Sequence, residues 1–277
     1  MSIPNDSTNH NVVVEVGGIP IEIQTTDAGF ESILRGRYGD YINPDANSEF
    51  TLRVQLTQMA ETSNSDDESE EAPTAEVWLE GKEWRFRRGD FQACWNPATR
   101  QGEVFQTANQ YSIDSVLRII HTLLLAPQGG FLLHSSSAVR NGKAFLFSGV
   151  SEAGKTTMAR LAPPDATLLT DEMSFIRKVD GRYFAYGTPF AGELAKPGEN
   201  ISAPIAALYL LKKAQENRID KLEPAEAVQR LLRNILFFAH EEEMVRQVFA
   251  GACAFVAAVP VYQLSFFPDH RVWDLIG

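Results

Sequence analysis

The feature that most constrains this chain is a loop, Gly149-Val150-Ser151-Glu152-Ala153-Gly154-Lys155-Thr156, which follows the pattern Gly, four residues, then Gly-Lys-Thr. Such a loop needs a strand before it and a helix after it, because backbone N–H groups at the start of a helix must converge on one anion. The run Ala144–Ser148 is typical of a buried strand, and Thr156–Leu161 is compatible with a helix. The sequence therefore predicts a strand, a phosphate-binding loop and a helix, in that order.

The residues of this loop suit a nucleoside triphosphate with magnesium. Two glycines, Gly149 and Gly154, permit a tight turn and a close approach of the backbone to phosphate oxygens. Lys155 is expected to reach the β and γ phosphates, and the hydroxyl of Thr156 is expected to ligate Mg²⁺. We therefore expect ATP and Mg²⁺ as cofactors. The nucleotide-binding set that we predict is Gly149, Ser151, Ala153, Gly154, Lys155, Thr156 and Thr157.

Two adjacent acids follow the loop at the end of the next apolar run. Asp171 and Glu172 come directly after Leu168-Leu169-Thr170, and a P-loop site needs a metal-facing acid at the end of a neighbouring strand. One carboxylate can hold magnesium, while the other or the same one accepts a proton from an attacking hydroxyl. The pair is therefore predicted to complete the site.

The N-terminal part of the chain has the pattern of strands. Short runs such as Val12–Val16 and Phe50–Leu56 recur between Asn11 and Gln106, so residues 1–110 are expected to form a β-rich N-terminal domain. Its acidic segment, residues 62–73, contains few apolar side chains and is predicted to be a solvated loop between two strands.

The remainder of the chain mixes strands with helices. Residues 111–277 are expected to form a second domain that carries the phosphate loop. Two helices are predicted at Pro224–Ala239 and Glu241–Ala257, followed by a strand at Val261–Phe266. The fold class predicted for the whole chain is thus two-domain α/β or mixed α+β.

Charge and composition limit the classes of partner that the chain is expected to bind. The formal net charge is -11, with six acids and no base between Glu61 and Glu71. This argues against sequence-independent nucleic-acid binding, which depends on Lys and Arg. Apolar runs such as Ile119–Ala126 are too short for a membrane helix, and the polar N-terminus lacks the order of a secretory signal. Cys94 and Cys253 are too far apart in sequence for a metal knuckle. We therefore expect a cytoplasmic protein with no nucleic-acid or membrane partner, and a homo-oligomer is left open.

Several short segments around the loop, taken together, are similar to a known family. These segments are Leu132-Leu133-His134, Val139, Asn141–Gly149, Gly154–Thr157 and Leu169–Glu172. They resemble the C-terminal kinase domain of HPr kinase/phosphorylase (HPr serine kinase) and its relatives. The similarity runs from about Gly130 to the end of the chain and is specific up to Glu193.

The resemblance implies a fold like that of phosphoenolpyruvate carboxykinase and assigns roles to the site residues. It implies that Asp171 is the catalytic base, that Glu172 is its metal-side neighbour, and that His134 lies near the phosphates. A glycine-punctuated loop in related proteins lies near the site, which implies metal or substrate contact for Glu193. The metal set is then Thr156, Asp171 and Glu193. On residue type alone, His134 and Glu193 fit a structural histidine and a surface carboxylate as well.

Two departures from the family pattern concern the same site. The family typically has Asp-Asp where this chain has Asp171-Glu172, and Ser where it has Thr156. Both changes keep the ligand chemistry, although the longer Glu arm leaves the division of metal and base roles open. The second signature of the family, which is tied to phosphorylase activity, is not found here, so dephosphorylation is not predicted.

The function that these residues predict is an ATP-dependent kinase. It would transfer the γ-phosphoryl group to a hydroxyl, with a serine of a protein or peptide preferred as the acceptor. Two alternatives stay open: a kinase for a small hydroxylated metabolite, and a nucleotide-binding regulatory module that has lost catalysis.

Overall fold

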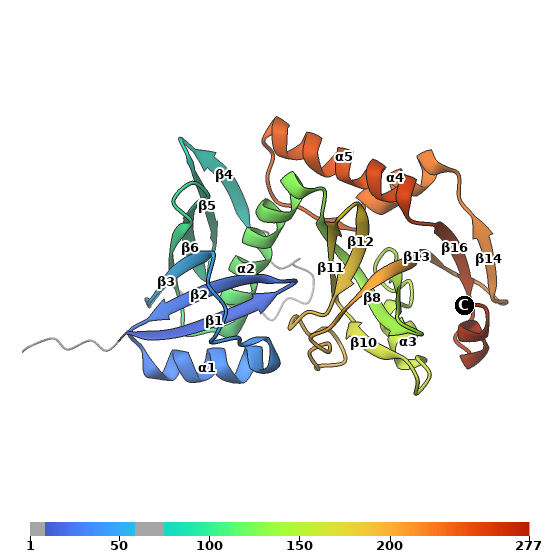
Figure 1. The fold of residues 1–277 in the computed structure, drawn as a ribbon, viewed down its shortest axis with the longest axis horizontal. Helices are drawn as coiled ribbons and strands as arrows, with labels where there is room; N and C mark the ends of the chain where they lie inside the picture. Colours follow the sequence, from blue (N-terminus) through green and yellow to red (C-terminus); the bar gives the residue numbers. More distant parts are fainter. Residues whose placement is uncertain (1–8, 59–74, 277) are drawn as a thin grey trace, which may run out of the picture. The chain divides into compact units, whose positions relative to one another are not determined.

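The protein is mixed α/β, with two β-sheets and few helices (Figure 1). The computed structural model describes residues 9–58 and 75–276, so the acidic segment predicted at residues 62–73 lies outside the described part. The predicted fold class, with a β-rich N-terminal region, is confirmed.

The chain divides into two compact units. One unit contains the described residues up to Ile120 together with Phe238–Glu241, and the other contains His121–Phe237 and the described residues from Glu242 onward. The division falls inside a helix, α2 (Gln110–Leu125), about ten residues after the boundary expected from the pattern change near residue 110.

The N-terminal unit is built on one sheet. Its seven described strands have the order β1-β2-β3-β7-β6-β5-β4, in which β3 is parallel to both its neighbours and the other pairs are antiparallel. Alternate residues face the core, as a sheet with one buried face requires. The strands are β1 (His10–Val16), β2 (Ile19–Thr25), β3 (Phe50–Leu56), β4 (Glu76–Glu80), β5 (Glu83–Arg88), β6 (Phe91–Asn96) and β7 (Gln101–Gln106).

A helix between β2 and β3 was not anticipated from the strand-like pattern of this region. Helix α1 (Ala28–Tyr38) begins at Asp27, whose carboxylate accepts a hydrogen bond from the backbone N–H of Phe30 at 2.7 Å. Phe30, Leu34 and Tyr38 recur four residues apart and are buried against the sheet. The helix therefore depends on a cap and on one narrow apolar stripe.

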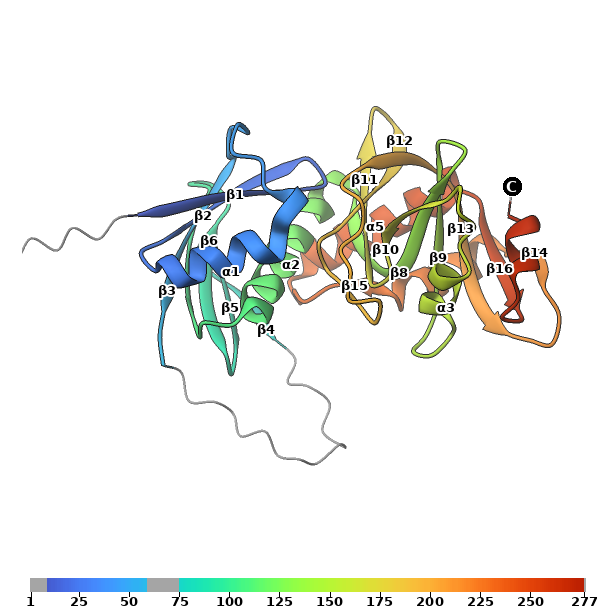
Figure 2. The same cartoon turned by 90° about the horizontal axis from the view of Figure 1, so that it is seen from below.

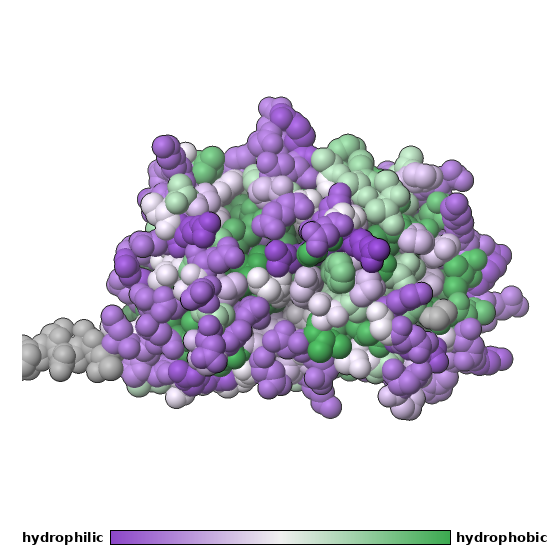
Figure 3. All heavy atoms as spheres, in the orientation of Figure 1, coloured by the Kyte–Doolittle hydropathy of each residue, from purple (hydrophilic) through white to green (hydrophobic). Residues whose placement is uncertain are grey.

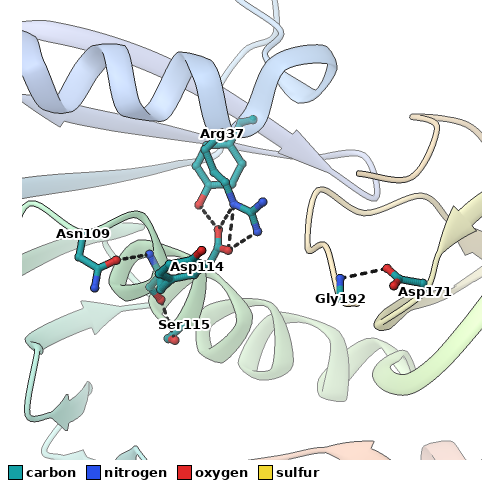
Figure 4. Close-up of polar contacts among 8 residues, drawn as sticks. Arg37, Asn109, Asp114, Ser115, Asp171 and Gly192 are labelled. Carbon is teal, nitrogen blue, oxygen red and sulfur yellow. Dashed lines mark hydrogen bonds and ion pairs between the residues drawn. The ribbon is translucent and has the colours of Figure 1, made fainter. Parts of the chain in front are cut away.

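A partly buried ion pair joins α1 to α2 (Figure 4). Arg37 donates to both carboxylate oxygens of Asp114, and the hydroxyl of Tyr38 donates to the same carboxylate at 2.8 Å. Burial is the first cause that raises the pKa of Tyr38, and the Asp114 charge adds to it. The three side chains therefore form one closed polar cluster inside the N-terminal unit.

Replacing Asp114 with alanine is expected to destabilise this unit by about 1.5–3 kcal/mol, because Arg37 and Tyr38 would lose their charged hydrogen-bond partner. Tyr38→Phe removes a single hydrogen bond and is expected to cost about 1–2 kcal/mol. Urea unfolding followed by tryptophan fluorescence measures both, since three of the four tryptophans lie in this unit. Equal midpoints for wild type and Asp114→Ala would show that the pair contributes nothing.

The C-terminal unit is built on a larger sheet. Its main path has the order β10-β8-β11-β12-β13-β16-β14, while β9 pairs with β8 and β13, and β15 pairs with β8. Within the described residues it has nine strands, and the pairs of β13 with β9 and with β16 are parallel. The strands are β8 (Phe131–Arg140), β9 (Lys143–Ser148), β10 (Thr167–Thr170), β11 (Met173–Val179), β12 (Arg182–Tyr186), β13 (Ser202–Lys213), β14 (Arg218–Lys221), β15 (Ile235–Leu236) and β16 (Val261–Phe266).

Helices lie on both faces of this sheet (Figure 2). Leu146 of β9 belongs to the core shared with α4 (Pro224–Leu232) and α5 (Glu242–Ala258). Phe147, the next residue, belongs to the opposite core with Met158 of α3 (Lys155–Arg160). Because side chains alternate along a strand, β9 is buried on both faces, as its unbroken apolar run predicts.

The helix predicted over Pro224–Ala239 is shorter than expected. It ends at Leu232, because Ile235 and Leu236 leave the helix and pair with Leu133 and Leu132 of β8. The helical spacing of apolar residues continues past Leu232 in the sequence, but these residues form a strand that pairs with β8. Three short 3₁₀ turns complete the described elements: Gly39–Tyr41, Ala126–Gln128 and His270–Asp274.

The surface over the part of α5 toward its C-terminal end is more apolar than its surroundings, while the N-terminal end of the helix is hydrophilic (Figure 3). Val245 and Phe249 of this helix are exposed. No helix in residues 9–58 and 75–276 is long and apolar enough to cross a membrane.

Candidate functional site

The predicted phosphate loop joins β9 to α3 and is packed against the sheet. Gly154 has φ +107°, and a Cβ added there would lie 2.8 Å from the ring of Phe266 in β16. A Cβ at Gly149 would lie 2.9 Å from that of Ala153. Glycine is therefore required at both positions, at Gly154 by the backbone angle as well as by space.

The centre of β8 explains why the loop and the acidic pair meet. Ser135 is paired with Ser148, the last residue before the loop, while His134 is paired with Met173, the first residue after the acidic pair. The hydroxyl of Ser148 donates to the His134 carbonyl at 2.8 Å. One stretch of β8 therefore brings together Ser148 and Met173, which are 25 residues apart in sequence (173 − 148), and with them the loop and the acidic pair.

The side chain of Lys155 is hydrogen-bonded to its own loop. Its side chain is buried, and its ammonium group donates to the carbonyls of Gly149 at 3.1 Å and Val150 at 3.2 Å. Its backbone carbonyl accepts a hydrogen bond from the buried hydroxyl of Ser136 at 2.8 Å. The first turn of α3 is thus fastened to β8, with the lysine folded over the loop.

Opposing effects act on the charge of Lys155. Burial lowers its pKa from the ordinary value, while the negative charges of Glu172 and Glu193 act to raise it. These acids therefore face the lysine closely enough to favour its charged form. An anionic ligand on the same side would favour that form further.

Asp171 is buried, and both its oxygens are hydrogen-bonded; Figure 4 shows the bond from Gly192. Oδ1 accepts from the backbone N–H of Gly192 at 3.0 Å, and Oδ2 accepts from that of Leu194 at 2.8 Å. Glu172 is more exposed than Asp171. The hydroxyl of Thr170 accepts from the backbone N–H of Glu172 at 3.1 Å and shapes the turn.

The segment that contributes these amides, residues 187–199, is anchored on β10 at both ends. Thr188 N–H donates to the Leu169 carbonyl at 3.1 Å, and Glu199 N–H donates to the Leu168 carbonyl at 3.0 Å. Gly198 lies so close to this strand that an added Cβ would be 1.6 Å from the Leu169 oxygen. The segment is therefore fixed against the strand that ends at the acidic pair.

Loop, acidic pair and anchored segment enclose one polar cavity of about 310 Å³. A lysine and several acids share this space, which suits a phosphate group accompanied by a cation. The lining residues are His134, Ser151, Glu152, Gly154, Lys155, Thr156, Thr157, Asp171, Glu172 and Glu193.

A larger groove of about 780 Å³ lies between α4 and α5 and shares no lining residue with this cavity. Its lining is mostly apolar, with Lys221 the charged member. Size alone would favour this groove as a ligand site, but it lacks the charges that a phosphate requires. The smaller cavity is therefore the candidate site for phosphate chemistry.

Comparison with known proteins gives the family. The model of the family described as SynChlorMet cassette protein ScmC matches residues 103–277. This chain belongs to the ScmC family. The comparison with curated proteins gave no match to the ScmC-family chain.

One solved structure similar to this ScmC-family chain is the Hpr(Ser) kinase/phosphatase from Coxiella burnetii. The two are 12% identical, the similarity covers 52% of this chain and 90% of that one, and the TM-score is 0.27. A score this low does not demonstrate a shared fold.

Most residues predicted for the site in this ScmC-family chain line one cavity. His134, Asp171, Glu172 and Glu193 line it, as do the predicted nucleotide-binding residues other than Gly149 and Ala153, which are buried. Their chemical roles stay predictions.

The amides of Gly192 and Leu194 and the hydroxyl of Ser136 were missed by sequence reasoning. Gly192, inside a glycine-punctuated segment next to Glu193, was the one available signal for the backbone contact with Asp171. A backbone amide carries no residue-type signature, so Leu194 gave none.

The lining of the ScmC-family cavity fits a magnesium–nucleotide complex. The first N–H groups of a helix have no partner inside it, so the start of α3 offers donors beside the Lys155 ammonium. Among the described residues no group of three or more His, Cys, Asp or Glu is arranged to hold a metal ion. Mg²⁺ usually binds through one or two carboxylates together with substrate phosphates and water, which Thr156 and the cavity acids can supply.

Proposed function

We propose that this ScmC-family protein binds ATP with Mg²⁺ in the cavity and transfers the γ-phosphoryl group to a hydroxyl, with a serine of a protein or peptide preferred. The observation that carries the proposal is that one cavity is lined by most of the phosphate loop, by buried Lys155 and by the acidic residue Glu172. This set pairs a cation for phosphate oxygens with a carboxylate for a proton or a metal.

The chemistry requires a cation, a proton acceptor and metal ligands from the chain. The ammonium group of Lys155 leaves the carbonyls of its own loop, binds phosphate oxygens and offsets the negative charge of the phosphates. The acceptor oxygen attacks the γ phosphorus, the bond to the β–γ bridging oxygen breaks, and ADP leaves. The hydroxyl proton passes to a carboxylate of the acidic pair. Mg²⁺, when bound by Thr156 and a cavity acid, would offset charge on the same phosphates.

A second candidate is a nucleotide-binding module without catalysis. The observation that favours it is the hydrogen-bonded state of Asp171, the base implied by the family resemblance, because each oxygen already accepts a backbone N–H. Such a module would bind the nucleotide and would not turn it over.

Calorimetric titration with Mg-ATP, followed by a hydrolysis assay with γ-labelled ATP, separates these functions. A kinase is expected to bind and to hydrolyse ATP slowly without an acceptor, and to label a serine-containing protein or peptide when one is supplied. Binding without any turnover would favour the module. A complete lack of Mg-ATP binding would exclude both.

Binding of the nucleotide is expected to weaken toward alkaline pH. The pKa of Lys155 is lowered by burial, so the free protein loses this charge below the ordinary value of 10.5, whereas phosphate favours the charged form. Affinity should therefore be full below the lowered pKa and fall as pH rises through it, with proton uptake on binding in that range. Calorimetry in two buffers of different ionisation enthalpy measures the uptake, and none at any alkaline pH would contradict this contact.

A further inference from the structure

The acidic pair places its two carboxylates in different surroundings. Asp171 is 3% exposed and has a backbone amide on each oxygen, while Glu172 is partly exposed in the cavity. A carboxylate that receives two amide donors is held in one orientation. Asp171 therefore has the contacts of a group that holds structure in place.

The two amides lie on either side of Glu193. Because the backbone N–H groups of Gly192 and Leu194 both donate to Asp171, the backbone is held before and after Glu193, and this fixes where its side chain leaves the backbone. Glu193 lines the cavity, and its charge acts on Lys155. Its side chain also lies 3.6 Å from the guanidinium of Arg160.

The glycine at position 192 makes this contact possible. A Cβ added there would lie 2.9 Å from Asp171 Oδ2 and 3.0 Å from Glu172 Oε2. A side chain at this position would press on both acids, while the Gly192 amide itself donates to Asp171. The contact between the segment and the acidic pair therefore depends on the absence of a side chain at position 192.

We propose that Asp171 is a positioning residue, whose carboxylate holds the backbone on both sides of Glu193 and so directs Glu193 toward the cavity that Lys155 also lines. Glu172 is then the member of the pair that accepts the proton of the acceptor hydroxyl. This division of roles rests on the proposed function, and it reverses the order implied by the resemblance to HPr kinase.

Hydrogen exchange tests the positioning without any activity. Asp171→Asn keeps one acceptor oxygen and loses the other, and Gly192→Ala breaks the contact while leaving the carboxylate intact. In both variants the amide of Gly192 or Leu194 should exchange about tenfold faster or more, as expected for a lost hydrogen bond to a charged group. Unchanged exchange at both amides in both variants would overturn the proposal.

Titration of Lys155 tests whether the held segment carries Glu193. The Glu193 charge acts to raise the pKa of Lys155, so Glu193→Gln should lower that pKa. Gly192→Ala should lower it in the same direction, although every charge is still present. NMR titration of the labelled lysine measures this, and a shift in Glu193→Gln with none in Gly192→Ala would show that Asp171 does not position Glu193.

The pH profile of ATP hydrolysis separates the two acids. Glu172→Gln is expected to lose about 10²–10⁴-fold in turnover together with the acid limb of the profile. Asp171→Asn and Gly192→Ala should lose about equal, smaller factors and keep that limb. Complete loss in Asp171→Asn alone, with its amides still protected, would make Asp171 the base. If the wild type neither binds nor hydrolyses Mg-ATP, the proposed function fails, while exchange and lysine titration still decide the positioning role.

Discussion

Lys155→Ala is expected to weaken Mg-ATP binding by about ten- to a hundredfold and to lower turnover by about a hundredfold or more. A hydrogen bond to a charged group contributes about 1.5–3 kcal/mol, and one donor to developing charge is worth about 10²–10³ in rate. The substitution also leaves the Gly149 and Val150 carbonyls without the ammonium that they now accept from. The loop should therefore lose both its cation and part of its internal bonding.

A matched control separates the effect of Lys155 from the loss of any positive charge near the site. Lys196→Ala removes the same charge from an exposed position in the segment of residues 187–199 and should leave affinity and turnover within about twofold. Calorimetry and the hydrolysis assay measure both variants, and circular dichroism checks that each is folded. Wild-type affinity and turnover in folded Lys155→Ala would mean that the loop does not bind phosphate.

Gly198→Ala is expected to be the most destabilising small substitution in the C-terminal unit. Its Cβ would lie 1.6 Å from the Leu169 carbonyl oxygen, a backbone atom that also accepts from Thr188. The segment must move away from β10, which we expect to cost at least about 3 kcal/mol. That corresponds to a fall in Tm of roughly 6–12 °C for a unit of this size.

Gly251→Ala is the matched control for this prediction. It makes the same chemical change inside α5, where the nearest atoms to an added Cβ are at 3.5 Å, an ordinary contact. Alanine is the better helix former, so this variant should gain about 0.5–1 kcal/mol. Thermal unfolding of the two variants is the measurement, and a Tm for Gly198→Ala at or above that of the wild type would refute the close approach.

The local order of strand, loop and helix around Lys155 could be predicted from sequence because one short motif demands all three. The apolar run before Gly149 indicates a strand, and the spacing of apolar residues after Gly154 indicates a helix, as the motif requires. Helix α1 was harder to find, since its buried residues form one narrow stripe and it contains Gly29 and Gly36, which favour turns. Its cap at Asp27 is visible only once the stripe is recognised.

The contacts that shape the site depend on pairings between distant parts of the chain. The truncation of α4 comes from the pairing of Ile235 with β8, and the surroundings of Asp171 come from amides more than twenty residues away. Apolar periodicity reports which face of an element is buried and does not report its partner. The acids themselves could therefore be named from sequence, but the difference between Asp171 and Glu172 could not.

The position of β9 in the sheet has a consequence for how the chain folds. Its neighbour β8 is joined to it by a tight turn, but its other neighbour, β13, begins more than fifty residues later, and the ring of Phe266 under Gly154 comes later still. Pairings of such sequence separation form slowly, since a long loop must close first. During synthesis the loop leaves the ribosome before the strand that flanks it and the ring that supports it. We therefore expect the nascent chain to fold without help from nucleotide and to acquire a working loop only in the last stage of folding.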